Sequence, residues 1–347
     1  MPHQQSREME ALSPQPSLRG EAARPDVSAG FRNPALACRP HPWSNTVTRS
    51  HPRIRIRARH GGMLLQDGFS ITFYLGHSHH DITQQIEHAL HVFQRSIVPA
   101  SLRWYCDYEG DFHEINSAGR KFLEEEFRSP QFAHIQLADH VQGVGDYQFV
   151  YDGQWRENPN DPDASRLLST VTFWLPTEFL ESQGPLAVHE LALNLSAGLP
   201  FTSGHAGLAF NAQFDLLGVD DLVHRERLRH PGIDVPDESA SLHLENRVRG
   251  IHWMNFLGPP VLAELGGVDA LRERLKSPGT TVQPLAEERA VIALGPEPDA
   301  GDTTRSPVLP AYRELARVLE PWMYFQGNSR PSTDPEAQRR WERRFLD

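Results

Sequence analysis

The stretch at residues 70–97, SITFYLGHSHHDITQQIEHALHVFQRSI, contains the clearest change from strand to helix in the chain. Its first part, residues 70–76, has the β-branched and aromatic composition of a β-strand. In its second part, apolar residues recur at helical spacing: Ile82, Ile86, Leu90, Phe93 and Ile97. This spacing predicts an amphipathic helix over residues 82–97.

The same stretch is rich in histidine, with five histidines between residues 77 and 91. His88 and His91 fall on the helix face opposite the apolar stripe, where side chains three positions apart are neighbours. Two histidines could hold a surface metal ion, but tight protein sites use three or four ligands. Neither an H-E-x-x-H motif nor a cysteine stands nearby. We therefore interpret this face as solvated.

Strand-like and helix-like segments continue on both sides of this unit, without an internal repeat. Residues 53–59 precede it, and residues 102–110 and 114–116 form a predicted strand–turn–strand. Further strands are predicted at 132–139, 146–152, 167–176, 281–285 and 290–295, and helices at 118–127, 177–184, 259–267, 268–277, 309–320 and from Asp334 onward. Antiparallel-type strands with segregated helices predict the α+β class. We expect a single domain, residues 53–347, with a mixed, mostly antiparallel sheet and flanking helices.

Three segments in the second half complete the predicted elements. Residues 186–196 and 207–214 are predicted as neighbouring strands joined by a turn at Ser203, Gly204 and His205. In a strand, the adjacent His189 and Glu190 would point to opposite faces. Residues 244–258 are predicted to be helical.

The cysteine content and the absence of long apolar runs indicate a reducing, aqueous compartment. The chain has 347 residues, of which 39% are apolar, so it can bury a core without disulfides or metals. Its two cysteines, Cys38 and Cys106, are far apart and fit neither a disulfide framework nor a thiolate zinc site. No stretch reads as a signal peptide or a membrane span. We expect a soluble, cytoplasmic protein with no membrane partner.

Charge is distributed unevenly along the chain. Residues 1–62 hold ten arginines and four acids, which is +6, so the remainder carries −17 of the net charge of −11. A body this acidic repels phosphate backbones and attracts basic surfaces, which argues against direct nucleic-acid binding. Residues 1–52 are rich in Pro, Ser, Gln and Arg and are predicted to be a disordered leader. Met63 immediately precedes the first clear apolar pattern, so a natural start there would place this leader upstream of the protein.

The sequence contains none of the common catalytic motifs. It has no G-x-S-x-G elbow, no phosphate-binding P-loop and no dinucleotide fingerprint. Ser203, His205 and Asp215 have the residue types of a catalytic triad, but a triad is defined by geometry and not by inventory. We expect no cofactor and no metal. The alternative is a metal-dependent or hydrolytic enzyme that uses the His-rich segment 77–91 or the turn Gly204–Gly207.

Residues 104–112, WYCDYEGDF, are better suited to protein binding than to catalysis. This predicted hairpin contains four aromatic residues and three acids. Exposed aromatic rings next to carboxylates suit a basic partner, and the candidate contacts are Asp107, Tyr108, Glu109 and Asp111. The alternative is that the aromatics are core residues and the acids merely face water. The acidic run Glu124–Glu126 is interpreted as a solvated helix face.

Five segments of the C-terminal half carry a recognisable order of motifs: residues 230–234, 251–275, 292–302, 309–321 and 339–345. They contain a Trp-x-Asn-x-Leu-Gly segment, a Leu-Gly-Gly segment, a Gly-x-x-Pro-x-x-Gly-Asp turn, a Pro-x-Tyr helix and a terminal Trp-x-x-Arg-Phe. The principal positions are Trp253, Asn255, Gly258, Gly266, Gly267, Gly301, Asp302, Tyr312, Trp341 and Phe345. This order resembles the type VI immunity family, and the resemblance extends more faintly back to about residue 65.

The resemblance implies a cytoplasmic antidote that binds and blocks a toxin delivered by a type VI secretion system. In this family the toxin is typically a nuclease of the VRR-Nuc, PD-(D/E)xK-like type. The acidic body fits this implication, because it could cover the basic DNA-binding groove of a nuclease. The shared motif positions are expected to hold the fold, since glycines, turn residues and buried aromatics have that role. A homodimer remains open.

Overall fold

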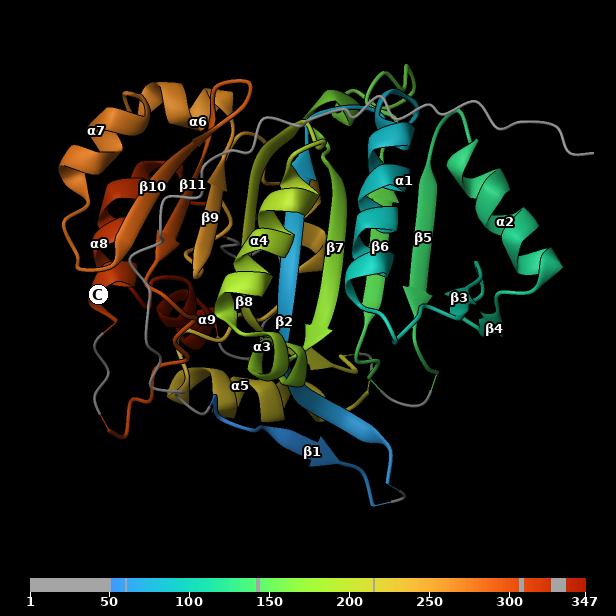
Figure 1. The fold of residues 1–347 in the computed structure, drawn as a ribbon, viewed down its shortest axis with the longest axis horizontal. Coiled ribbons are helices and arrows are strands. Elements are labelled where there is room, and N and C mark those ends of the chain that lie inside the picture. The colour runs from blue at the N-terminus through green and yellow to red at the C-terminus, as the bar shows by residue number, and fades with distance from the viewer. Residues whose placement is uncertain (1–50, 60, 142–143, 215, 306–308, 326–334) are drawn as a thin grey trace, which may run out of the picture. The chain divides into compact units, whose positions relative to one another are not determined.

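The α+β class is confirmed by the computed structural model, which describes residues 51–347 except 60, 142–143, 215, 306–308 and 326–334. All described residues fall within one compact unit. The predicted disorder of residues 1–52 lies outside the described residues, apart from His51 and Pro52. Within the described part, eleven strands form one sheet, and helices lie against it (Figure 1).

Each pair of neighbouring strands in this sheet is antiparallel. Their bounds are β1 Arg55–Arg57, β2 Met63–Leu75, β3 Trp104–Cys106, β4 Phe112–Glu114, β5 Ala133–Ala138, β6 Gln148–Gly153, β7 Ser169–Pro176, β8 Phe201–Ala212, β9 Met254–Leu257, β10 Thr280–Leu285 and β11 Arg289–Leu294. The order across the sheet is β10-β11-β9-β8-β2-β7-β6-β5-β3-β4, with β1 added beside β2. The hairpin β3–β4 therefore forms one edge of the sheet.

Most of the described helices occur between strands along the chain, and the last two follow β11. Their bounds are α1 His79–Ser96, α2 Ser117–Phe127, α3 Thr177–Gln183, α4 Pro185–Ser196, α5 Val219–Arg229, α6 Pro259–Glu264, α7 Gly267–Arg274, α8 Pro310–Leu319 and α9 Pro335–Glu342. Short 3₁₀ turns occur at Ala164–Arg166, Glu238–Leu242 and Glu320–Trp322. In Figure 1, α1 and α4 cross in front of the central strands, and α2 stands beside β5.

The predicted strand-to-helix unit is confirmed and forms the centre of the core. Strand β2 alternates between two faces, and its residues Phe69, Ile71 and Phe73 are fully buried. The helix α1 buries its predicted stripe, and Phe93 meets Phe173 of β7 with ring centroids 5.2 Å apart. Packing of the α1 stripe on the sheet therefore explains why this segment sets the architecture.

The segment predicted as a second strand pair is a helix followed by a long central strand. Residues 185–196 form α4, which begins with Pro185 at its first position and buries Val188, Leu191, Ala192 and Leu195. The predicted turn at Ser203–His205 lies inside β8. A Cβ on Gly204 would lie 2.6 Å from Phe73 Cδ1, so this glycine permits close approach of β2 rather than a turn.

The predicted helix at 244–258 is also wrong. Its last part forms β9, between β8 and β11, and all four residues of β9 are buried. A strand covered on both faces carries a continuous apolar run, which removes the alternation that identifies half-buried strands. Gly258 ends the run, because a Cβ there would lie 2.4 Å from the Thr202 carbonyl oxygen.

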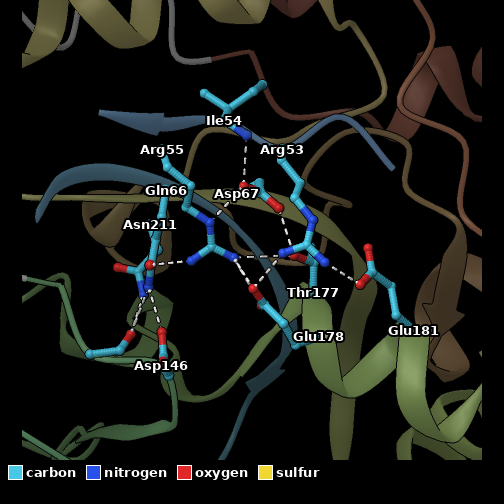
Figure 2. Close-up of polar contacts among 11 residues, drawn as sticks. Arg53, Ile54, Arg55, Gln66, Asp67, Asp146, Thr177, Glu178, Glu181 and Asn211 are labelled. Carbon is cyan, nitrogen blue, oxygen red and sulfur yellow. Dashed lines mark hydrogen bonds and ion pairs between the residues drawn. The ribbon is translucent and has the colours of Figure 1, made fainter. Parts of the chain in front are cut away.

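An ionic cluster fastens the first described strand to the body (Figure 2). The buried Asp67 carboxylate accepts hydrogen bonds from Ile54 N at 2.8 Å and from Thr177 Oγ1 at 2.6 Å. Arg55 lies 3.2 Å from the same carboxylate and also binds Glu178. Burial alone would raise the pKa of Glu178, but its backbone hydrogen bond and the guanidinium of Arg55 lower it overall. The arginine-rich segment thus becomes part of the fold from Arg53 onward.

Candidate functional site: an acidic aromatic surface at the sheet edge

Asp107 holds the turn of the β3–β4 hairpin. Its carboxylate accepts hydrogen bonds from Glu109 N and Asp111 N, each at 2.9 Å, and lies 2.7 Å from His113 Nε2. The Asp111 N–H contributes most to lowering the pKa of Asp107, and His113 adds to it. Because these contacts occupy the carboxylate, Asp107 positions the hairpin rather than offering a free charge.

Tyr108 presents its ring at the surface from a fixed position. Its side chain is 75% exposed, and its ring meets Phe122 of α2 edge to face with centroids 5.3 Å apart. The hydroxyl donates to the Glu126 carboxylate, and this hydrogen bond raises the pKa of Tyr108 to about 12. The alternative that the hairpin aromatics are simply core residues is therefore excluded for Tyr108.

The acidic run Glu124–Glu126 in α2 was predicted to be a solvated helix face, and this prediction is wrong for Glu126. Its neighbours Glu124 and Glu125 are exposed, as expected, but Glu126 is buried. Besides Tyr108, its carboxylate accepts a hydrogen bond from His134 N of β5 at 3.0 Å. Glu126 thus links the hairpin, α2 and β5. The sequence offered no signal that separated it from the two neighbouring glutamates.

Glu109 and Asp111 supply the free charge of this surface. Both are exposed, and no hydrogen bond or ion pair of either carboxylate is found with any residue that the structure describes. They lie on the same turn as Tyr108, at the outer edge of the sheet. An exposed ring on the same turn as two unpaired carboxylates is a suitable contact for a basic protein surface.

The His-rich segment does not assemble as one site. His88 and His91 are exposed on α1, as predicted. His79, by contrast, is buried at the helix start, where its Nδ1 lies 2.9 Å from the Tyr151 hydroxyl. Among the described residues, none of these histidines belongs to a group of three or more potential metal ligands.

Ser203 and His205 do not have the geometry of a catalytic triad. Ser203 Oγ donates to the Arg247 carbonyl oxygen at 3.1 Å. The ring of His205 stacks on His252 with centroids 3.9 Å apart and an interplanar angle of 16°. Asp215, the third residue of the inventory, lies outside the described residues. The two described residues are therefore engaged elsewhere.

His205, His252 and Asp234 form a buried polar cluster that the sequence did not predict. Their potential ligand atoms lie within 4.8 Å of one another. However, the two imidazole planes are nearly parallel, so their in-plane lone pairs do not converge on one ion. Arg249 is ion-paired to Asp234, and Arg344 approaches the same carboxylate to 3.9 Å. Two guanidiniums against one carboxylate already leave positive charge there, so the cluster does not fit a metal cation.

Burial and mutual repulsion keep this cluster in one charge state. Burial, reinforced by His252 and Arg249, lowers the pKa of His205 well below its ordinary value. Burial would raise the pKa of Asp234, but Arg249 and His252 hold it well below the usual range. The histidines are thus neutral and the aspartate ionised at neutral pH.

A pocket of about 500 Å³ opens between α5 and α9 beside this cluster. Arg249 donates to Asp234 and to the Val235 carbonyl, and Arg344 donates to the Pro231 carbonyl, so both are satisfied internally. The Arg344 guanidinium also lies 3.8 Å above the ring of Trp341. The described lining contains no Ser, Thr, Cys or Lys that could act as a nucleophile.

The motif positions hold loops and helices together. Trp253 donates to the Gly295 carbonyl at 3.0 Å, and the Asn255 side chain bonds both the N–H and the carbonyl of His252. Gly266, Gly267 and Gly301 have positive φ values, Asp302 binds Arg229, and Tyr312 packs on Phe345. With Trp341 under Arg344, these contacts fasten the C-terminal half. None of these contacts involves the hairpin surface.

The fold is of the α+β class, and its candidate site is the exposed acidic and aromatic tip of the β3–β4 hairpin. The sequence matches the family model described as type VI immunity for VRR-NUC over residues 85–345. The chain therefore belongs to this family of type VI immunity proteins, as the motif order predicted. A solved structure of a Pseudomonas aeruginosa T6SS protein has the same fold, with a TM-score of 0.68 and 19% identity over 84% of this chain and 87% of that chain.

No curated protein matches the sequence. No helix in the described part of the chain is both long and apolar enough to cross a membrane.

Proposed function

We propose that this immunity protein binds a VRR-Nuc nuclease toxin directly and prevents DNA from reaching the toxin's active site. The observation that carries the proposal is the family match over residues 85–345. The net charge of −17 over residues 63–347 supports it, because a DNA-cleaving enzyme needs a basic surface for its substrate. Inhibition occurs in the cytoplasm, where the incoming nuclease would meet DNA.

The contact surface in this proposal is the tip of the β3–β4 hairpin, with Tyr108 as the anchor. Glu109 and Asp111 face the basic toxin, while Asp107 keeps the turn in shape. A ring held by Phe122 and Glu126 loses little conformational freedom on binding. The surface is therefore prepared for a partner before the partner arrives.

The protein acts by binding alone in this proposal, with no enzymatic step, cofactor or nucleic-acid ligand. Two contacts support this view. The Ser203 hydroxyl donates to the Arg247 carbonyl oxygen, and Arg249 is ion-paired to Asp234 in the His205 cluster. Metal analysis of purified protein and of a His88→Ala, His91→Ala variant tests it, and we expect no stoichiometric metal in either. Light scattering of the free protein and of its toxin complex would show whether a dimer forms.

Co-expression with the cognate toxin is the direct test of the proposed function. Cells that carry the active toxin should survive only when this protein is present, and the two proteins should co-purify. An inactive toxin variant serves as the control, because it should still co-purify without killing cells. Survival without a complex would point to another mechanism, and death despite expression would refute the proposal.

The hairpin is tested by reversing its free charges. We expect the double variant Glu109→Lys, Asp111→Lys to weaken toxin binding at least tenfold, since it removes attraction and adds repulsion. The matched control is Glu273→Lys, which reverses an exposed charge on α7, away from the hairpin. Equal affinity of both variants would move the interface away from the hairpin and leave the immunity function intact.

A further inference from the structure

Two aromatic side chains lie together at the ends of the strands next to the hairpin surface. Phe132 immediately precedes β5 and is 46% exposed, and Trp155 follows β6 and is half-buried. Their ring centroids are 6.2 Å apart at an interplanar angle of 82°, which is an edge-to-face contact. Aromatic area of this kind at a protein surface is characteristic of interaction sites.

The backbone around Trp155 is fixed from both sides. Gln154 N donates to Ser169 Oγ at 2.9 Å, and the Gln154 carbonyl accepts from His79 N at 2.7 Å. On the other side, Arg156 N donates to Ser78 Oγ at 2.9 Å. The indole is therefore displayed from an ordered loop, which lowers the entropy cost of binding.

A chain of contacts joins this aromatic pair to Tyr108. The Tyr108 hydroxyl binds Glu126, which accepts from His134 N at 3.0 Å, two residues after Phe132. His134 Nδ1 then lies 2.5 Å from Asp152 Oδ1 on β6, three residues before Trp155. The hairpin tip and the aromatic pair are thus linked through Glu126 of α2, His134 of β5 and Asp152 of β6.

The charges beside Trp155 have the same sign as those on the hairpin. Glu157 is exposed, and a hydrogen bond from Ser78 lowers its pKa, so it is ionised at neutral pH. The adjacent Arg156 turns inward and donates to the Leu167 carbonyl. Aromatic rings with an acidic border attract lysine and arginine side chains and repel phosphate groups.

We propose that Phe132 and Trp155, together with Tyr108, are the aromatic anchors of the toxin-binding surface. They are covered in the complex by a positively charged face of the toxin, whose lysine and arginine stems lie on the rings. This inference rests on the proposed function. It extends the proposed interface from the hairpin to the ends of β5 and β6. It also assigns most of the binding free energy to uncharged aromatic residues.

The test measures the affinity of full-length protein for catalytically inactive toxin by titration calorimetry. We expect Phe132→Ala and Trp155→Ala each to weaken binding by about 10-fold or more, the range of aromatic hot spots. The control is Leu186→Ala, which truncates a side chain of matched exposure, 48%, on α4. Its affinity should stay within about twofold of the original. Thermal melting identifies any variant that fails to fold.

A second measurement needs no variant. Hydroxyl-radical footprinting of the complex should show Phe132 and Trp155 protected relative to the free protein, while Leu186 keeps its reactivity. Unchanged reactivity of both rings, or affinities within twofold for both alanine variants, would overturn the inference. If the unaltered protein fails to bind toxin at all, the proposed function fails instead, and the two failures are thereby distinguished.

Discussion

At the residue scale, the stability of the fold depends more on single buried polar groups than on the exposed groups that the sequence analysis singled out. Asp234, the last residue of the motif segment 230–234, is bound by Arg249 and approached by His252 and Arg344, a role that its position in the motif did not predict. Desolvation of such a charge is offset only by its partners, so removing one partner leaves a buried charge uncompensated.

Replacement of Asp234 is predicted to be strongly destabilising. We expect Asp234→Asn to lower the free energy of unfolding by about 3–5 kcal/mol, because Arg249 would lose its buried counter-ion. Urea denaturation measures this change. The control is Asp269→Asn, whose carboxylate is 91% exposed in its ion pair, with an expected change below about 1 kcal/mol. A loss of similar size in both variants would contradict the role given to Asp234.

Acidification is predicted to destabilise the fold through the stacked histidines. The pKa values of His205 and His252 are lowered in the folded protein by burial, so the unfolded chain binds protons first as the pH falls. Stability should be at its full value above the ordinary histidine pKa of about 6.5 and decline progressively below it. Melting temperature against pH tests this. A His205→Gln, His252→Gln variant should flatten the decline, and an unchanged profile would argue against these residues.

The residues of the candidate site were predicted from their types, but the separate role of each residue within the site was not. The sequence singled out Asp107, Tyr108, Glu109 and Asp111, and the structure shows that the first of these four caps the turn. Glu126 and the Phe132–Trp155 pair were missed, because their roles depend on contacts between segments distant in the chain. Such contacts leave no periodic signal in the sequence.

At the element scale, prediction succeeded where an apolar period was clear and failed where alternation, charge or complete burial obscured it. Helix α1 has a polar face, so the helical period of its apolar residues could be recognised in the sequence. In α4, alternating leucines at 191, 193 and 195 imitated a strand, although Val188, Leu191 and Leu195 follow a helical period. Strand β9 lost its alternation through complete burial, and the charged α5, Val219–Arg229, was not predicted.

The attachment of β1 to the body supplies the element-scale prediction. We expect Asp67→Ala to lower the free energy of unfolding by about 2–3 kcal/mol, because Ile54 N and Thr177 Oγ1 lose a buried charged acceptor. Arg53→Ala removes a 53% exposed partner of the same cluster and should cost less than about 1 kcal/mol. Chemical denaturation compares the two. If Arg53→Ala proved the more costly, the cluster would depend on its surface pairs.

At the scale of the whole molecule, the proposed function rests on the acidic charge of residues 63–347 and on the hairpin surface with the unpaired carboxylates of Glu109 and Asp111. This charge should steer a basic toxin toward the protein over a distance set by ionic screening. We expect the association rate constant to fall by about tenfold or more between 50 and 300 mM salt, with a much smaller change in dissociation. Stopped-flow mixing measures both. An association rate constant that does not change with salt would show that the net charge does not steer binding.

If this protein blocks a nuclease by covering the surface to which DNA binds, it should compete with DNA for the toxin. The decisive measurement is a titration of purified toxin with this protein, scored by DNA cleavage. We expect complete inhibition at an equimolar ratio, relieved by excess DNA added before the protein. Undiminished cleavage by toxin that is saturated with this protein would contradict it.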